Sequence, residues 1–277
     1  MKSIIWFRND LRIDDNPAMR VAYDNSTEVH AIFLYSKDQL QKHNEANVKL
    51  DFLIENLKCL SNLLKELNIP LSIIDSKGFD EDSEIILKTV QERDIDKVFF
   101  NKQFGQDEQK RDKEVINILE GSGIKAESFN DQIVYEAGSI RTGQDNPYSV
   151  FTPFKRKWVE NFDMEFLDIE HKYTPMNQGI FSSNISSFNF DFKIEHKVDM
   201  SIWPAGEESA LNRLKDFLEN KVTNYSKDRN DPIIDGTSRM SPYLALGIIS
   251  SKRCILEGLK LNNFEFNSGN NGITKWI

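Results

Sequence analysis

Residues 1–130 of this 277-residue chain predict a doubly wound α/β fold built on a parallel sheet. Short runs of β-branched and aromatic residues alternate regularly with longer stretches that have helical spacing. The short runs are also apolar along their whole length, which is typical of strands covered on both faces. Right-handed crossovers place the carboxyl ends of such strands at one edge of the sheet, where ligands bind.

The expected elements follow one another in a regular order. The first strand is Ser3–Phe7, and Asn16 and Pro17 suit the N-cap and first turn of a helix that runs to Tyr23. The longest helix is expected over Ala46–Leu67, where leucines recur at three- and four-residue spacing. The later strands are Val29–Tyr35, Leu71–Ile74, Lys97–Phe100 and Ala126–Phe129, and helices near Glu81–Glu92 and Asp107–Glu120 separate the last three.

The common nucleotide-binding and metal-binding motifs are missing from the sequence. Gly121–Ala126 matches G-x-G-x-x-A, but it follows a helix and precedes a strand, the reverse of a dinucleotide site. We therefore predict a helix C-terminus and turn there. Cys59 and Cys254 have no metal-like spacing, so neither a zinc site nor a disulfide framework is indicated. Ordinary NAD and ATP enzymes become improbable classes.

Charge and hydropathy limit the partners of the chain. No apolar run approaches the roughly 20 residues that cross a bilayer, and charge follows the first apolar run at Arg8, unlike a secretory signal. We expect a soluble cytoplasmic protein with no membrane partner. The formal net charge is −9, yet residues 221–277 hold eight basic and five acidic side chains. This mildly basic segment is either a weak indication of DNA contact or an ordinary solvated surface.

Two polar segments are candidates for binding. Arg8–Asn16 follows the first strand with two arginines among three acids, and it could form either a buried ion-pair network or a binding rim. Asn224–Ser250 has a turn at Gly236, hydroxyls that could cap a helix, and an apolar run typical of a helix. The start of that helix could bind an anion such as a pyrophosphate, and the alternative is an ordinary capped helix.

Three motifs in this order resemble the DNA photolyase and cryptochrome family. They are Trp6–Arg12 with an Asp-Asn pair soon after it, Phe151–Lys155, and Asp235–Leu244. The resemblance covers the chain from Lys2 to Ile277. It implies a Rossmann-like antenna domain over residues 1–130, an interdomain linker over 131–204, and the start of an all-helical FAD-binding domain over 205–277. A helix over Ala205–Leu218 is expected to open that domain.

The resemblance also assigns site residues, position by position. The positions that match flavin-holding residues of the family are Tyr225, Thr237, Ser238, Arg239, Met240, Ser241 and Trp276. Arg229 matches a position that contacts DNA phosphate. His43, Asp107 and Glu108 match residues that contact a 5,10-methenyltetrahydrofolate antenna, although the best-known pattern has an amide where this chain has Asp107. No metal and no catalytic residue is expected within this chain.

The implied activity is light-driven repair of cyclobutane pyrimidine dimers, a carbon–carbon lyase reaction in which reduced FAD gives an electron to the lesion. The implied partner is damaged DNA, bound by a monomer. A cryptochrome-type photoreceptor without repair activity remains the alternative, and a (6-4) lesion is not excluded. The family normally continues well beyond the position of Trp276, so we expect an N-terminal fragment that by itself binds FAD weakly or not at all.

Overall fold

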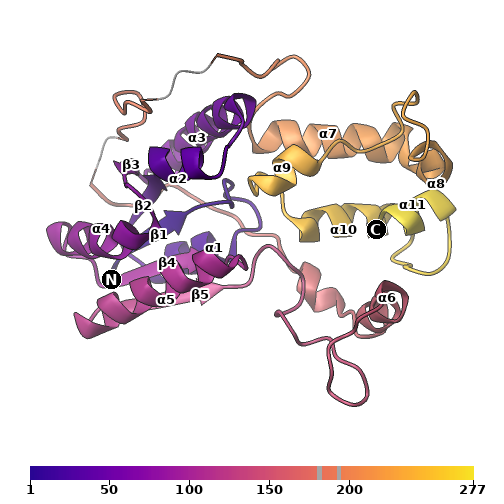
Figure 1. The fold of residues 1–277 in the computed structure, drawn as a ribbon, viewed down its shortest axis with the longest axis horizontal. Helices are drawn as coiled ribbons and strands as arrows, with labels where there is room; N and C mark the ends of the chain where they lie inside the picture. Colours follow the sequence, from indigo (N-terminus) through magenta and orange to yellow (C-terminus); the bar gives the residue numbers. More distant parts are fainter. Residues whose placement is uncertain (180–182, 192–194) are drawn as a thin grey trace.

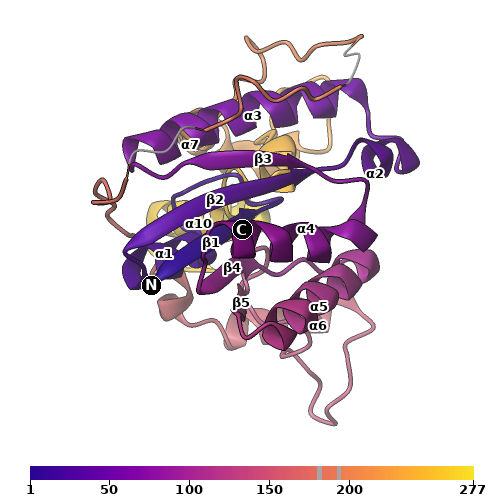
Figure 2. The ribbon, with the colours of Figure 1, turned by 90° about the vertical axis from the view of Figure 1, so that its left-hand side faces the viewer.

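The computed structural model describes residues 1–179, 183–191 and 195–277, and it contains a five-stranded parallel sheet (Figure 2). The strands lie in the order β3-β2-β1-β4-β5, and every neighbouring pair is parallel. Their bounds are β1 Lys2–Phe7, β2 Glu28–Tyr35, β3 Leu71–Asp75, β4 Lys97–Asn101 and β5 Lys125–Phe129. All five predicted strands are present, and the predicted doubly wound fold is confirmed.

The two faces of the sheet bury two separate apolar cores. Ile5 and Phe7 of β1 point into a core shared with helices α1 and α3, whereas Ile4 and Trp6 point into a core shared with α4 and α5. The bounds of these helices are α1 Pro17–Asn25, α3 Asn47–Glu66, α4 Phe79–Glu92 and α5 Gln106–Gly121. Because both faces are covered, the strands must be apolar along their whole length.

Local signals at the helix ends agree with the predictions. The side chain of Asn16 accepts a hydrogen bond from the Met19 amide at 3.0 Å, and Pro17 occupies the first turn of α1. Helix α5 ends at Gly121, and the turn that follows has Gly123 at φ +76°. Among residues 1–130 one short helix was not predicted: α2 covers Lys37–Lys42 after the carboxyl end of β2.

Beyond the sheet, the regular elements of the described residues are all helices, and long loops join them (Figure 1). The predicted helix over Ala205–Leu218 is present as α7, and the motif Phe151–Lys155 lies in a helix, α6, that the sequence reading did not predict. The bounds of these elements are α6 Phe151–Glu160, η1 Met164–Leu167, α7 Glu207–Asn220, η2 Val222–Asn224, α8 Tyr225–Asp228, α9 Ser241–Ala245, α10 Ser251–Leu261 and α11 Asn271–Trp276. Helices α7, α10 and α11 lie side by side in Figure 1.

Aromatic residues of the expected linker pack against two different parts of the chain. Phe188 and Phe190 lie edge-on to Tyr35 of β2, with ring centroids 5.7 and 5.3 Å away. Phe166 packs on Phe162, whose ring is 4.7 Å from that of Phe266 beyond α10. Two further phenylalanines of that segment, Phe181 and Phe192, lie outside the described residues.

The loop after β1 joins the sheet to the helical part through buried Arg12. The Nη1 atom of Arg12 donates to Asp131 Oδ2 and to the carbonyl oxygen of Gly247, both at 3.1 Å. The Leu11 amide donates to the carbonyl oxygen of Leu246, also at 3.1 Å. For Arg12, the structure therefore favours the ion-pair network over the binding rim.

Carboxylates of the loop and of α7 form further hydrogen bonds between the loop after β1 and the helical part. Glu207, in the first turn of α7, accepts hydrogen bonds from the amides of Ile13 and Asp14, each at 3.0 Å. Arg253 of α10 donates to Asp14 at 2.8 Å, and the hydroxyl of Ser250 donates to Asp15. Burial raises the pKa of Asp15 to about 6, although the nearby Arg12 acts against this shift. The loop thus connects two parts of the chain mainly through buried polar groups.

Candidate functional site

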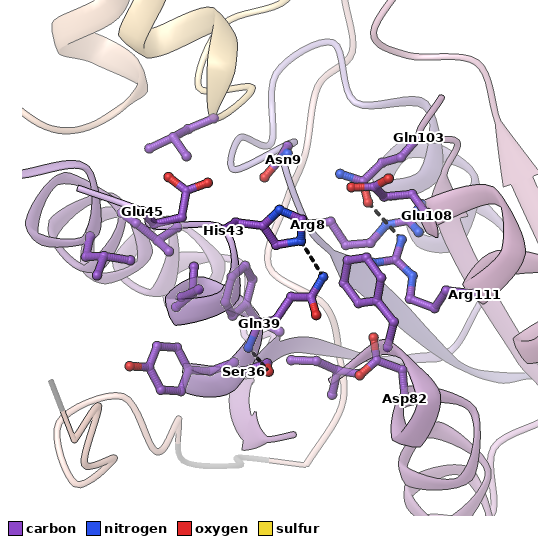
Figure 3. A pocket seen from close by; sticks show the side chains of 18 of the residues that line it. Arg8, Asn9, Ser36, Gln39, His43, Glu45, Asp82, Gln103, Glu108 and Arg111 are labelled. Atoms are coloured by element: carbon purple, nitrogen blue, oxygen red, sulfur yellow. Dashed lines mark hydrogen bonds between the residues drawn. The ribbon is translucent and has the colours of Figure 1, made fainter. Parts of the chain in front are cut away.

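A cavity of about 250 Å³ lies at the carboxyl ends of β1, β2 and β4 (Figure 3). This is the edge where doubly wound sheets bind ligands, beside the point where the strand order reverses between β1 and β4. Its polar lining comes from the segments that follow β1, β2, β3 and β4, and consists of Arg8, Asn9, Ser36, Gln39, His43, Glu45, Lys49, Asp82, Gln103, Glu108 and Arg111. Trp6, Phe33, Phe79 and several leucines supply the apolar lining.

Two arginines share one carboxylate at the back of this cavity. Asp112 Oδ1 accepts from Arg8 Nη1 at 2.5 Å and from Arg111 Nη2 at 2.8 Å. Both guanidinium groups stack on the ring of Trp6, at 4.5 and 4.8 Å from its centroid. Burial and the repulsion from Arg111 lower the pKa of Arg8 to about 10, which keeps Arg8 charged at neutral pH. Asp112 pairs with both guanidinium groups, and the carboxylates of Asp10 and Asp82 also interact with these charges.

Two residues that line the cavity each have a buried donor without a hydrogen-bond partner among the described residues. The donors are Nε1 of Trp6 and Nε of Arg8, whose side chains are 1% and 6% exposed. Leaving a buried donor unpaired costs about 1–3 kcal/mol. A ligand with hydrogen-bond acceptors would remove this cost, so the cavity suits a polar aromatic molecule better than a purely apolar one.

The structure brings two of the three antenna candidates together. His43, the C-cap residue of α2, and Glu108, in the first turn of α5, both line the cavity (Figure 3). The Nε2 atom of His43 lies 2.8 Å from the side-chain nitrogen of Gln39. Asp107 instead lines a neighbouring hollow with Lys42 and Lys110. The structure therefore separates Asp107 from the other two.

Sequence reasoning missed several residues that line the cavity, among them Gln39, Gln103 and Arg111. Gln103 comes two residues after β4, where a ligand-facing position is expected. Arg111 comes three residues after Glu108 on α5, so the two side chains share one helix face. The Arg111 Nη2 atom donates to Gln103 Oε1 at 2.8 Å, which fixes both side chains. From the sequence, Arg8 is identified only as part of the charged loop Arg8–Asn16.

The predicted flavin residues fall into two groups. Tyr225 begins α8 and Trp276 ends α11, and both rings pack on Phe217 of α7, with centroids 5.8 and 5.2 Å away. Arg229, the candidate for DNA contact, is exposed and lies with its guanidinium 5.6 Å from the Tyr225 ring. The second group is the turn before α9. There the side chain of Met240 is 2% exposed and belongs to the core, unlike its neighbours.

The helix at this turn is shorter than predicted. Helix α9 covers only Ser241–Ala245, with Pro242 in its first turn, and its N-cap Met240 makes no side-chain hydrogen bond. Neither Ser241 nor Thr237 caps it, which corrects that prediction. Gly247, at φ +61°, interrupts the apolar run, and α10 starts anew after its cap Ser250. A single turn of helix has a small dipole, so anion binding here depends on side chains.

The turn before α9 contains side chains that can bind an anion. The hydroxyls of Thr237, Ser238 and Ser241 make no hydrogen bond within the described part of the chain, and Thr237 and Ser241 are exposed. Arg239 pairs with Asp235 at 2.9 Å and remains 43% exposed. Hydroxyls and a guanidinium so close together in sequence are groups that can bind a phosphate or pyrophosphate.

The described residues contain neither a candidate metal site nor a candidate membrane-spanning helix. Over residues 1–179, 183–191 and 195–277, no cluster of three or more His, Cys, Asp or Glu side chains could hold a metal ion. Within the same residues, none of the helices has the length and hydropathy of a membrane span.

Comparison with known proteins assigns most of the chain to the family that the sequence motifs resemble. Residues 3–175 match the family described as DNA photolyase. A deoxyribodipyrimidine photo-lyase of Buchnera aphidicola is 32% identical over 95% of this chain and 54% of that protein. A class III photolyase structure from Agrobacterium tumefaciens has a TM-score of 0.81 at 24% identity, over 99% of this chain and 56% of that one.

A second structural relative comes from an archaeon. Like the other matches, it is covered by this chain over only about half of its length. The photolyase from Sulfolobus tokodaii, described as having two FAD molecules that imply a novel light-harvesting cofactor, has a TM-score of 0.69 at 20% identity. It covers 93% of this chain and 54% of that structure. The chain spans about half the length of the curated relatives it matches.

Proposed function

The chain belongs to the DNA photolyase family, and on that premise we propose that its gene product uses light to repair cyclobutane pyrimidine dimers in DNA. The observation that supports this proposal is the turn over residues 237–241. It places three hydroxyls without hydrogen-bond partners among the described residues next to Arg239 in sequence, and such groups can bind a flavin phosphate. Curated relatives along nearly the whole chain are named deoxyribodipyrimidine photo-lyase, which supports the same reaction.

The residues present fit FAD in their chemistry. Thr237, Ser238, Ser241 and Arg239 would hold its phosphates and ribityl chain, because all four have hydrogen-bond donors to spare. Tyr225 and Trp276 would supply flat apolar walls from α8 and α11, with Met240 contributing its backbone. The chemistry that bound FAD supplies is the transfer of an electron to the dimer. What this chain contributes is binding and orientation.

Contact with DNA would come from the same part of the molecule. Arg229 is exposed, stands beside Tyr225, and can form charge-assisted hydrogen bonds to a DNA phosphate. A dimer must leave the duplex before repair, and damage lowers the few kcal/mol that this extrusion costs; photolyases are among the enzymes for which such flipping is described. Arg229 would position the backbone and read no sequence.

The cavity at the sheet edge is our candidate for the antenna chromophore, proposed to be 5,10-methenyltetrahydrofolate. The carboxylate of Glu108 can accept hydrogen bonds from the amide-like edge of a pterin, and His43 lines the same cavity. The unpaired N–H groups of Trp6 and Arg8 can donate to acceptors of the ligand. Asp107 would act only from the neighbouring hollow.

Replacing Glu108 with glutamine is expected to weaken chromophore binding by about tenfold or more, since a hydrogen bond to a charged group contributes roughly 1.5–3 kcal/mol. Titration of the purified protein with methenyltetrahydrofolate, followed by absorbance, measures the dissociation constant. Asp107→Asn is the matched control, because it removes the neighbouring charge outside the cavity and should change binding less than threefold. Equal effects of the two substitutions would contradict the placement of the pterin.

The repair reaction is tested on the gene product, expressed with whatever follows Ile277 in its reading frame. Protein with reduced FAD is mixed with dimer-containing duplex DNA, and loss of dimers is counted under blue light and in the dark. We expect repair only in the light. Light-driven reduction of the flavin with no loss of dimers would overturn the proposal and favour a photoreceptor.

A further inference from the structure

The turn before α9 is held at Asp235 by two cations from different elements. Asp235 Oδ2 accepts a hydrogen bond from Lys221 Nζ at 2.8 Å, and Asp235 Oδ1 lies 2.9 Å from Arg239 Nη2. Lys221 is the C-cap residue of α7. The hydrogen bond from Lys221 and the charges of both cations lower the pKa of Asp235, so the bridge is ionised at neutral pH. One carboxylate therefore links the end of α7 to the guanidinium of Arg239.

The backbone of this turn depends on such support. Arg239 has φ +51°, a left-handed conformation that costs a side-chain-bearing residue free energy. Gly236 presses against α8 so closely that a Cβ atom there would overlap the Cβ atom of Asp228. The path from α8 to Arg239 is thus defined at Gly236 by packing and at Asp235 by charge.

We propose that Asp235 is a positioning residue for Arg239 in the flavin-binding segment. This inference rests on the proposed function, which assigns Arg239 to a flavin phosphate. A guanidinium has five N–H donors, so Arg239 can contact a phosphate while it stays paired with Asp235. Fixing the side chain beforehand lowers the conformational entropy that binding would otherwise remove.

Geometry and net charge predict opposite results when this carboxylate is neutralised. Lys221 also lies 3.7 Å from Asp216, so the four charges of the group nearly balance. Asp235→Asn would therefore increase the local positive charge, and by charge alone it should tighten anion binding. If Asp235 positions Arg239, the same substitution weakens binding, and Asp235→Glu restores it because the longer carboxylate can still pair with Arg239.

The first experiment needs no flavin and asks whether Asp235 restrains Arg239. Limited trypsin digestion of the chain is followed by mass spectrometry, and the rate of cleavage after Arg239 is measured. We expect Asp235→Asn to raise this rate about two- to fivefold, as the loss of an exposed ion pair would, with Asp235→Glu close to the unsubstituted protein. Glu208→Gln is the control, since it removes one exposed charge at the opposite end of α7.

The second experiment measures the dissociation constant for FAD of the gene product by fluorescence titration. We expect Asp235→Asn to bind about two- to fivefold more weakly, and Asp235→Glu and Glu208→Gln to bind normally. Tighter binding by Asp235→Asn, or failure of Asp235→Glu to restore binding, overturns the inference. If the unsubstituted protein binds no FAD, the proposed function fails and the flavin role of Asp235 fails with it. The trypsin rates still decide whether Asp235 holds Arg239.

Discussion

Replacing Arg12 with methionine is expected to lower the free energy of unfolding by about 3–5 kcal/mol, which is the usual effect of removing one partner from a buried ion pair. Arg12 is 2% exposed and donates to Asp131 and to the Gly247 carbonyl oxygen. Methionine has a similar length and fills much of the space. It leaves Asp131 buried without a cation and the carbonyl without this donor, and this loss dominates the expected effect.

Urea denaturation followed by circular dichroism measures this change. Arg20→Met provides the control, because Arg20 pairs with Asp24 on the surface of α1 at 4.0 Å and 43% exposure. Its loss should change the free energy of unfolding by less than about 1 kcal/mol. A loss below 1 kcal/mol for Arg12→Met would mean that the network contributes little to the attachment of the helical part.

The substitution Gly247→Ala is expected to cost a similar amount for a different reason. Gly247 has φ +61°, and a Cβ atom there would overlap the carbonyl oxygen of Asn9 and lie 2.6 Å from Asp10 Cα. The left-handed conformation contributes about 1–2 kcal/mol to the cost. Forcing the two backbones apart adds about 1–3 kcal/mol, as overpacking does elsewhere.

A matched glycine separates these two contributions. Gly123 also has positive φ, at +76°, but a Cβ atom there would meet nothing within 4 Å. Gly123→Ala should therefore cost only the conformational part, about 1–2 kcal/mol, in the same urea experiment. Equal losses for Gly123→Ala and Gly247→Ala would contradict the close approach between the loop after β1 and Gly247.

The sheet could be predicted because each of its strands has a local signal. A run such as Ser3–Phe7 is apolar at every position, and the cap at Asn16 is visible in the sequence together with Pro17. The break after α9 could not be predicted in this way. Gly247 adopts positive φ where Asn9, more than 200 residues earlier, approaches its backbone. No local pattern records such a contact.

The candidate site was predictable in its location and less so in its residues. The carboxyl edge of the sheet follows from the fold class, but Asp107 and Glu108 are adjacent and the resemblance named both. The helix period could have separated them: Glu108, Asp112, Val115 and Leu119 recur on one face of α5, and the last three are buried. Arg8 and Arg12 lie in one loop without helical periodicity, so the sequence does not separate them, although Arg8 lines the cavity and Arg12 contacts the helical part.

The loop after β1 contacts both the cavity and the helical part, and these two contacts are thermodynamically related. Arg8 reaches the cavity and Arg12 reaches Gly247 within a stretch of five residues. If a ligand in the cavity changes the conformation of this stretch, it also changes the affinity between the two parts of the chain. Linkage requires the reverse effect to have the same size. Occupancy at the sheet edge and attachment of the helical part are then one coupled equilibrium, which either binding event can shift.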